Sequence, residues 1–372
     1  MTPIENEADL AGMIAGAREP LAIRGGGTRG IDPAGNLLAI SGLTGVDLYE
    51  PGALTLVAAA GTPVADLDRL LATENQRLAF EPMDHRRLLG TTGEPTIGGV
   101  VAGNISGPRR IQAGACRDFL LGVRYVDGTG TVIKNGGRVM KNVTGYDLVK
   151  LMAGSWGTLG VLTQVSLKVL PRAQTQATLE VSGTGLTGAI RAMSAALGSP
   201  YEVSGAAYDP SEDTVFIRIE GFADSVAYRL GRLNALLNSH GTVTTTEDAQ
   251  TSATQWNRIR DVEPFAGTPG DVWRLSVKPS DAPGICDRLD ADGLLLDWGG
   301  GLIWARVPSG TDLRGRAGGF GGHATLVRSD AETRATLGMF QPEPAPLAAI
   351  SAGLRARFDP RGIFNPGLMG RT

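Results

Sequence analysis

Two glycine-rich stretches in the first third of the chain could bind an anion through the backbone. Residues 24–30 have the sequence RGGGTRG, and residues 96–107 have the sequence TIGGVVAGNISG. Glycine lets successive peptide N–H groups converge on an anion because no Cβ stands in the way. Gly98 and Gly99 also open a segment that could form a short helix, whose N-terminus would favour an anion. The two stretches together predict two backbone cradles around one diphosphate, and hence a dinucleotide ligand.

The first stretch does not follow the pattern of classical NAD-binding domains. It lacks the spacing Gly-x-Gly-x-x-Gly, and no clear ribose-binding acid follows about twenty residues later. A third glycine-containing element, residues 142–148 with residues 154–161, comes directly before a predicted long strand. A classical NAD site is therefore disfavoured, and a different dinucleotide is expected.

The sequence offers three candidates for catalysis without singling out one of them. Arg274 and Lys278 alternate along a predicted strand so that both would face one side, where they could hold a carboxylate. Two cations on one strand face also occur on an ordinary solvated surface. His323 could take up a hydroxyl proton, or could be a structural histidine or an interface contact.

Composition excludes several classes of function. Hydrophobic residues make up 42% of the 372 residues and charged residues 20%, and the formal net charge is -3, so no basic surface argues for nucleic acid. No run approaches the roughly 18 apolar residues that cross a bilayer, so we expect no direct membrane insertion. The cysteines and histidines lack metal-ligand spacing, so we expect no metal site. The N-terminus does not resemble a secretory signal, and a cytoplasmic protein is predicted.

The order of predicted elements indicates an α+β fold with more than one domain. Segments 119–126 and 131–134 predict a β-hairpin, and a long strand over 161–170 ends at Pro171. From residue 174 the order strand, helix, strand, strand, helix, strand predicts a ferredoxin-like sandwich, with no internal repeat. Residues 314–322 are expected to form a loop.

In combination, these motifs resemble those of the FAD-binding oxidoreductases of the vanillyl-alcohol oxidase and p-cresol methylhydroxylase (PCMH) type. The resemblance rests on residues 24–30, 96–107, 142–148, 154–161 and 359–367. It implies a two-subdomain PCMH-type FAD-binding domain over 1–172 and a ferredoxin-like α+β cap, for substrate or interface contacts, over 173–340. A C-terminal helix and extended tail over 341–372 would pack back on the FAD domain.

Within that family the chain is similar to the FAD-binding E subunits of bacterial glycolate oxidase complexes. The stretches that carry this similarity are residues 80–84, 106–110, 136–147 and 321–326. The similarity implies oxidation of glycolate to glyoxylate, with electrons passing via flavin to a larger FAD-binding subunit and an iron–sulfur subunit. Any place at the inner membrane would come through these partner subunits.

The resemblance also implies the residues that bind FAD. Relatives with covalent flavin place a histidine in or near the first loop, where this chain has Thr28 and Arg29, so non-covalent FAD is implied. Arg24 could instead hold the loop by a salt bridge. The implied cofactor-binding residues are Arg24, Gly25, Gly26, Gly27, Thr28, Arg29, Gly30, Pro82, Met83, Thr96, Ile97, Gly98, Gly99, Ala102, Asn104, Ser106, Gly107, Gly157, Gly160 and Val161.

Two departures from the catalytic 2-hydroxy-acid dehydrogenases leave alternatives open. Those relatives carry a histidine-rich metal site in the second domain, where this chain offers only His323. They also carry Glu where this chain has Trp156. The chain could therefore be a self-sufficient FAD-dependent enzyme for another small 2-hydroxy acid such as D-lactate, or a non-catalytic subunit that holds flavin for assembly.

Overall fold

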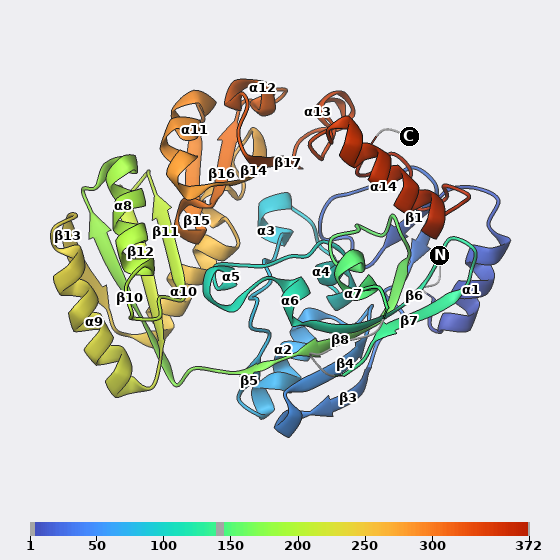
Figure 1. Ribbon diagram of the computed structural model, residues 1–372, viewed down its shortest axis with the longest axis horizontal. Coiled ribbons are helices and arrows are strands. Elements are labelled where there is room, and N and C mark those ends of the chain that lie inside the picture. The colour runs from blue at the N-terminus through green and yellow to red at the C-terminus, as the bar shows by residue number, and fades with distance from the viewer. Residues whose placement is uncertain (1–3, 139–144, 371–372) are drawn as a thin grey trace.

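A five-stranded antiparallel sheet forms the centre of the N-terminal half in the computed structural model, which describes residues 4–138 and 145–370 (Figure 1). The strand order is β3 (Val46–Glu50), β4 (Thr55–Ala59), β8 (Val161–Lys168), β6 (Leu120–Val126) and β7 (Val132–Gly136). Strands β6 and β7 pair from Gly122 opposite Gly136 to Val126 opposite Val132, which confirms the predicted hairpin.

Short helices and two small strand pairs surround this sheet. The helices are α1 (Glu7–Gly16), α2 (Val64–Thr73), α3 (Arg86–Leu89), α4 (Ile97–Ala102), α5 (Arg110–Ala113), α6 (Cys116–Phe119) and α7 (Leu148–Met152). Strand β1 (Leu21–Arg24) pairs in parallel with β2 (Asn36–Ala39), and β5 (Gln76–Arg77) pairs with β9 (Leu170–Pro171). Leu67 and Leu71 of α2 are fully buried against Leu56 and Leu167 of the sheet, so apolar residues at helical spacing fix α2 in place.

The C-terminal half is built on an eight-stranded antiparallel sheet. Its order is β13 (Thr242–Thr246), β10 (Thr175–Ser182), β12 (Thr214–Gly221), β11 (Gly205–Asp209), β15 (Gly293–Asp297), β16 (Leu302–Val307), β14 (Asp271–Val277) and β17 (Gly322–Arg328). Two ferredoxin-like units make up this sheet. In the first, helices α8 (Gly185–Leu197) and α9 (Ala223–Leu237) alternate with β10 to β13, and in the second, α11 (Ala282–Leu289) and α12 (Leu313–Ala317) alternate with β14 to β17.

The expectation of a single sandwich without a repeat is therefore corrected. The units share an order of elements, and they join where β11 pairs with β15 at Tyr208 and Leu296. Helix α10 (Ala249–Arg260) links them. The predicted loop over 314–322 is also corrected, because its first residues belong to α12, which Asp312 caps by accepting the backbone N–H of Gly315.

The two faces of the large sheet have different partners. Helices α8, α9, α11 and α12 bury one face in a continuous apolar core. On the other face, Trp304 and Val327 share a cluster with Met83 and Leu88 from the N-terminal half. This face therefore meets the N-terminal half, and a site between the halves can draw on both.

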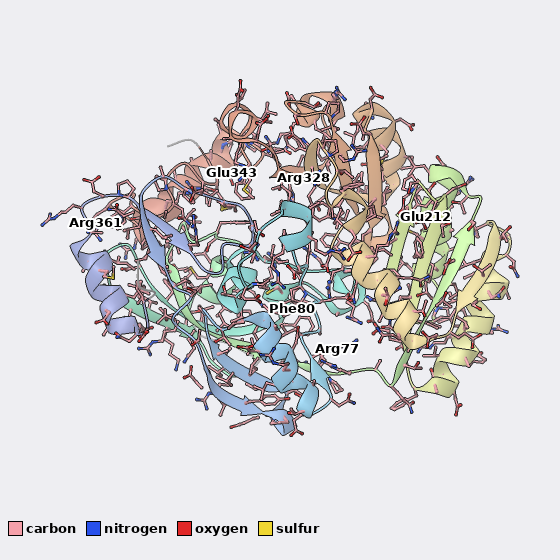
Figure 2. The ribbon with its side chains drawn as sticks, turned by 180° about the vertical axis from the view of Figure 1, so that it is seen from behind. Arg77, Phe80, Glu212, Arg328, Glu343 and Arg361 are labelled. Carbon is pink, nitrogen blue, oxygen red and sulfur yellow. The ribbon has the colours of Figure 1, made fainter. Side chains whose placement is uncertain are left out.

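The chain returns to its beginning at the C-terminus. After α13 (Ala331–Leu337), helix α14 (Ala345–Phe358) runs over the N-terminal half near β1 (Figure 1). Leu21 N–H donates to the carbonyl of Ile363 at 2.7 Å. Arg361, labelled in Figure 2, donates to the carbonyls of Ile14 and Gly128, which fastens the tail to α1 and to the β6–β7 turn. No helix within 4–138 or 145–370 combines the length and apolar character needed to cross a membrane.

Candidate functional site

The three glycine-rich elements border one cavity, although residues 142–144 lie outside the described part of the chain. The predicted residues that line this cavity, which we call the cradle, are Arg24, Gly25, Gly26, Gly27, Thr28, Arg29, Thr96, Gly98, Gly99, Ala102, Gly157, Gly160 and Val161. Within the described residues, no backbone N–H from Gly25 to Arg29 donates to a protein acceptor. These free donors, on a loop without Cβ atoms at three positions, fit a diphosphate.

The first loop requires glycine for close packing as well. A Cβ on Gly26 would lie 1.6 Å from the carbonyl oxygen of Glu94, a backbone atom that has no side-chain freedom to move away. Arg24 forms an ion pair with Asp32, so it holds the loop in addition to lining the cradle.

The second loop, residues 96–107, helps to line the cradle, but the N–H groups in the first turn of α4 do not face an anion freely. Thr96 caps α4, and the N–H groups of Ile97 and Gly98 donate to the carbonyls of Thr62 and Ala60 at 2.9 and 2.7 Å. Gly99 N–H donates to Thr96 Oγ1 at 3.3 Å. These first-turn N–H groups are therefore occupied by the protein, and the expectation that they would bind the anion is corrected.

The C-terminal tail closes the cradle through Asn365, for which sequence reasoning assigned no role. Its Oδ1 accepts the N–H of Ile23 at 2.8 Å, and its Nδ2 donates to the carbonyl of Trp156 at 2.9 Å. Asn365 is buried, lines the cradle, and has a φ of 42°, a conformation that asparagine tolerates better than most residues. The signal in the sequence that could have pointed to Asn365 is the segment 359–367, in which Pro366 and Gly367 follow the asparagine.

A second cavity of about 340 Å³ adjoins the cradle and lies between the two halves. Arg29, Gly103 and Trp156 line both cavities. The predicted residues Met83, Asn104, Ser106, Arg274 and His323 line the second one. Asn104 and Ser106 also accept the backbone N–H groups of Arg117 and Cys116, which orders the wall between the cavities.

This second cavity is strongly cationic. Arg29, Arg110 and Arg274 all line it, and none of them forms a hydrogen bond or an ion pair with an acidic side chain in the described residues. Burial lowers the pKa of Arg29 to about 10, and burial together with the neighbouring charge of Arg110 lowers that of Arg274 to about 10. Arg29 Nε is buried without any partner. Guanidinium groups left without an acid are suited to a carboxylate ligand.

Two neutral histidines face the same cavity. Burial, together with the charge of Arg29, lowers the pKa of His85 to about 3. Burial and the charges of Arg274 and Arg110 also lower the pKa of His323. Both imidazoles are therefore unprotonated near pH 7 and can accept a proton or a hydrogen bond. Sequence reasoning missed His85 because only the fold brings it to the same cavity as His323. No group of three metal-ligating side chains occurs in the part of the chain that is described.

Several predicted residues lie elsewhere. Lys278 is exposed and lines neither cavity, because β14 ends at Val277 and Pro279 starts a 3-10 turn (Pro279–Asp281) that breaks the strand alternation. Four predicted cofactor residues also lie outside both cavities. Gly30 accepts a hydrogen bond from Arg334, Ile97 is in the core, Gly107 packs on Glu81, and Pro82 lines a third, interdomain cavity.

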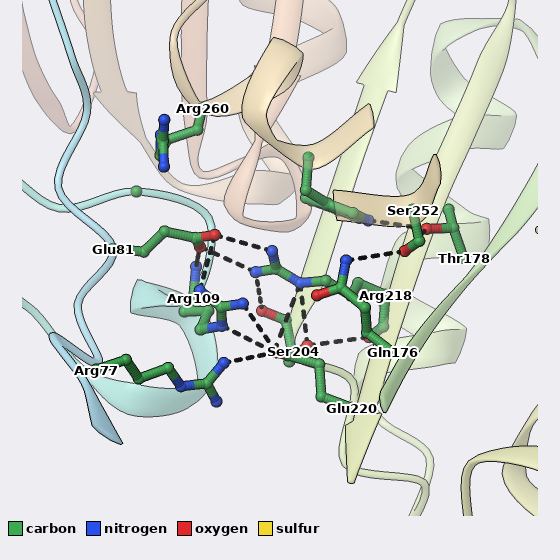
Figure 3. A network of polar contacts seen from close by, with 12 residues as sticks. Arg77, Glu81, Arg109, Gln176, Thr178, Ser204, Arg218, Glu220, Ser252 and Arg260 are labelled. Atoms are coloured by element: carbon green, nitrogen blue, oxygen red, sulfur yellow. Dashed lines mark hydrogen bonds and ion pairs between the residues drawn. The ribbon is translucent and has the colours of Figure 1, made fainter. Parts of the chain in front are cut away.

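A buried ion-pair network connects the two halves beside this site (Figure 3). Arg218 Nη1 and Nη2 donate to Glu81 Oε1 and Oε2, each at 3.0 Å, and Arg109 contacts both Glu81 and Glu220 at 2.8 Å. Arg77 reaches Glu220 at 2.7 Å. Burial disfavours the ionised acids, but the guanidinium groups of Arg218 and Arg109 outweigh it and hold the pKa values of Glu81 and Glu220 below 4.5. The network joins the cap to the N-terminal half, and its residues line the third, interdomain cavity.

The fold and the cradle define a PCMH-type FAD-binding oxidoreductase. Residues 4–136 match the family model described as FAD binding domain. A solved structure of alkyldihydroxyacetonephosphate synthase superposes with a TM-score of 0.71 at 16% identity, over 98% of this chain and 75% of that one, and so supports the fold. FAD is thus the cofactor of the chain.

The chain belongs to the family of the glycolate oxidase subunit GlcE. It is 36% identical to glycolate oxidase subunit GlcE of Escherichia coli (strain K12), over 95% of this chain and 93% of that protein. Over 44% of this chain it is also 33% identical to glycolate oxidase subunit GlcD of Bacillus subtilis (strain 168), of which 34% is covered. The prediction of an FAD-binding glycolate oxidase subunit is thereby confirmed at the level of the family.

Proposed function

We propose that the chain is the FAD-binding subunit of a complex that oxidises glycolate to glyoxylate and passes the electrons to partner subunits. The observation that carries this proposal is the cationic cavity, which adjoins the cradle and shares Arg29 and Trp156 with it. A small anionic substrate held there would lie next to the part of the flavin that extends beyond the diphosphate. The partners would be a larger FAD-binding subunit and an iron–sulfur subunit.

The side chains of the cavity match what the oxidation of a 2-hydroxy acid requires. Conversion of glycolate to glyoxylate removes a hydride from C2 and a proton from the hydroxyl group, and bound FAD supplies the acceptor for the hydride. Arg274 and Arg110 bind the carboxylate by charge-assisted hydrogen bonds. His323, which is neutral, takes up the hydroxyl proton, while burial of His85 makes its imidazole a poor base.

The cradle supports non-covalent FAD. Relatives with covalent flavin carry a histidine in or near the first loop, where this chain has Thr28 and Arg29, and the described lining of the cradle contains no histidine. The free N–H groups of the first loop would hold the diphosphate of FAD, and α4, residues 157–161 and the tail would form the walls around the cofactor. We place the complex in the cytoplasm, at the inner membrane only through its partners.

The test is to purify the full chain alone and together with its co-expressed partner subunits, and to follow flavin and activity. We expect FAD to be released on denaturation, and glycolate to bleach the flavin of the complex under anaerobic conditions. If the chain alone oxidised glycolate with a dye acceptor as fast as the complex, the subunit role would be contradicted.

Other outcomes would favour the two alternatives. Faster reduction of the isolated chain by D-lactate than by glycolate would indicate a self-sufficient enzyme for another 2-hydroxy acid. A colourless chain, with no flavin released on denaturation, would indicate a non-catalytic assembly subunit. Either result would overturn the proposal.

A further inference from the structure

One indole contacts two of the unpaired arginines of the cationic cavity. The Cζ atom of Arg110 lies 4.6 Å from the ring centroid of Trp298, and that of Arg274 lies 5.0 Å from it. Arg110 belongs to the N-terminal half, on α5, whereas Arg274 and Trp298 belong to the cap. Trp298 therefore joins two cations that come from opposite sides of the cavity.

The indole is itself held firmly. Its Nε1 donates to the carbonyl of Gly107 at 3.1 Å, and its backbone N–H donates to Asp297 Oδ1 at 2.7 Å. The backbone φ of Trp298 is 54°, in the left-handed region that bulky residues rarely adopt. A backbone conformation of this kind costs free energy and persists only where its surroundings impose it, often at functional sites.

Without the indole, the guanidinium groups of Arg110 and Arg274 would tend to separate. Neither forms an ion pair with an acid in the described residues, and their like charges repel. The π face of tryptophan attracts a guanidinium, most strongly where water is excluded. Trp298 offers that attraction to both groups at once and is anchored to each half of the protein, by Gly107 on one side and β15 on the other.

We infer that Trp298 is a positioning residue, which holds Arg274 and Arg110 together so that both bind one small carboxylate. This inference rests on the proposed function and extends it. Trp298 does not line the cavity itself, so it acts through the two arginines and not by touching the ligand. Its loss should weaken carboxylate binding while the rate of the chemical step is largely retained.

The cap offers a matched control for the loss of a buried tryptophan. Trp273 is fully buried and lies 4.7 Å from the Cζ atom of Arg314, in the apolar core on the helix-covered face of the sheet. Trp273→Leu removes a similar ring and a similar cation contact away from the cavity. It should therefore lower the thermal stability without changing carboxylate affinity.

The experiment titrates the FAD-loaded full chain with oxalate, read from the flavin absorbance, and measures KM and kcat for glycolate in the complex. We expect Trp298→Leu to weaken oxalate binding and raise KM by about tenfold, with kcat within about twofold. Trp298→Phe keeps an aromatic face and should restore most of the affinity. Trp273→Leu should bind oxalate as the unaltered chain does.

Two results would overturn the inference: unchanged oxalate affinity in Trp298→Leu, or equal losses of affinity in Trp298→Leu and Trp273→Leu. Failure of the proposed function would look different. An unaltered chain that binds oxalate but whose flavin glycolate does not reduce, alone or in the complex, would contradict the function. The oxalate affinities of the variants would still decide the role of Trp298.

Discussion

Asn365 accepts a 2.8 Å hydrogen bond from the backbone N–H of Ile23, a residue 342 positions earlier in the chain. Ile23 lies in the strand that leads into the first glycine loop, and the same asparagine donates to the carbonyl of Trp156. One side chain therefore joins the tail, the first loop and the third glycine element. The tail therefore forms part of the cradle, and we expect FAD binding and tail docking to be coupled.

Replacement of Asn365 tests this coupling. Asn365→Ala removes two hydrogen bonds, worth about 1 kcal/mol each. It also puts alanine, which has no side-chain amide to stabilise a left-handed backbone, at a φ of 42°. We expect the free energy of unfolding to fall by roughly 2–3 kcal/mol and the Kd for FAD to rise about tenfold or more. Denaturant unfolding and flavin fluorescence measure the two effects. Asn365→Gly, which suits the backbone, isolates the contribution of the side-chain bonds, and FAD affinity unchanged in both variants would contradict the coupling.

Gly26 should be intolerant of any side chain. Gly26→Ala would bring its Cβ to 1.6 Å from the carbonyl oxygen of Glu94, so the loop must move and its N–H groups must lose their arrangement. We expect the purified variant to lose its FAD while the cap stays folded, as judged by flavin content and circular dichroism. Gly12→Ala is the control, because its Cβ would meet nothing within 4 Å on α1 and should stabilise the helix by about 0.5–1 kcal/mol. An FAD-replete Gly26→Ala protein would show that the two loops are not packed as described.

The network around Glu81 should make the protein sensitive to acid. The folded-state pKa values of Glu81 and Glu220 lie below 4.5, so the stability that these groups contribute is present above pH 4.5 and is lost as the pH falls through their folded-state values. Glu81→Gln removes the acid that pairs with both Arg218 and Arg109 and leaves Arg218 only Glu220 at 3.6 Å, so it should cost about 3–5 kcal/mol at pH 7. Urea unfolding at pH 7 and at a series of pH values below 4.5 measures both effects. A variant as stable as the unaltered protein at pH 7 would contradict the role of the network.

Asp297 should make the stability of the protein fall as the pH rises, which is opposite to the effect of Glu81 and Glu220, and in a higher pH range. Burial raises its pKa from 3.8 to about 7, so the folded protein retains a proton that the unfolded chain releases, and stability falls as the pH rises from about 4 to 7. Asp297→Asn carries no charge and can still accept the N–H of Trp298 through its Oδ1. We expect the gain in Tm of this variant over the unaltered protein to be larger at pH 8 than at pH 5. A gain independent of pH would show that Asp297 is not responsible.

Local signals in the sequence were enough to predict the elements of the cradle. Glycine runs and the long strand before Pro171 are readable without tertiary structure, and the elements they predict appear in the fold. Local signals did not predict which backbone N–H groups of each loop are free to bind an anion. Whether the N–H groups of α4 are free depends on the carbonyls of Ala60 and Thr62, which lie more than thirty residues away in the chain.

The second cavity depends on contacts between distant segments, which sequence patterns do not record. Alternation along a strand grouped Arg274 with Lys278, yet the strand ends between them, and the cation that joins Arg274 is Arg110 from the other half. His85 and Trp298 were invisible for the same reason. The repeat in the cap was missed because the two units share the order of their elements but no motif that the sequence showed.

A comparison of Arg274→Met with Lys278→Met in the assembled, FAD-loaded complex, by anaerobic reduction with glycolate, tests whether the substrate binds in the cationic cavity of this chain. If this chain binds the substrate carboxylate in its own cavity, Arg274→Met keeps its flavin but has a KM raised on the order of 100-fold. Lys278→Met, altered at an exposed position outside the cavity, behaves as the unaltered complex does. Equal KM values in the two variants would contradict the account and place the substrate elsewhere in the complex.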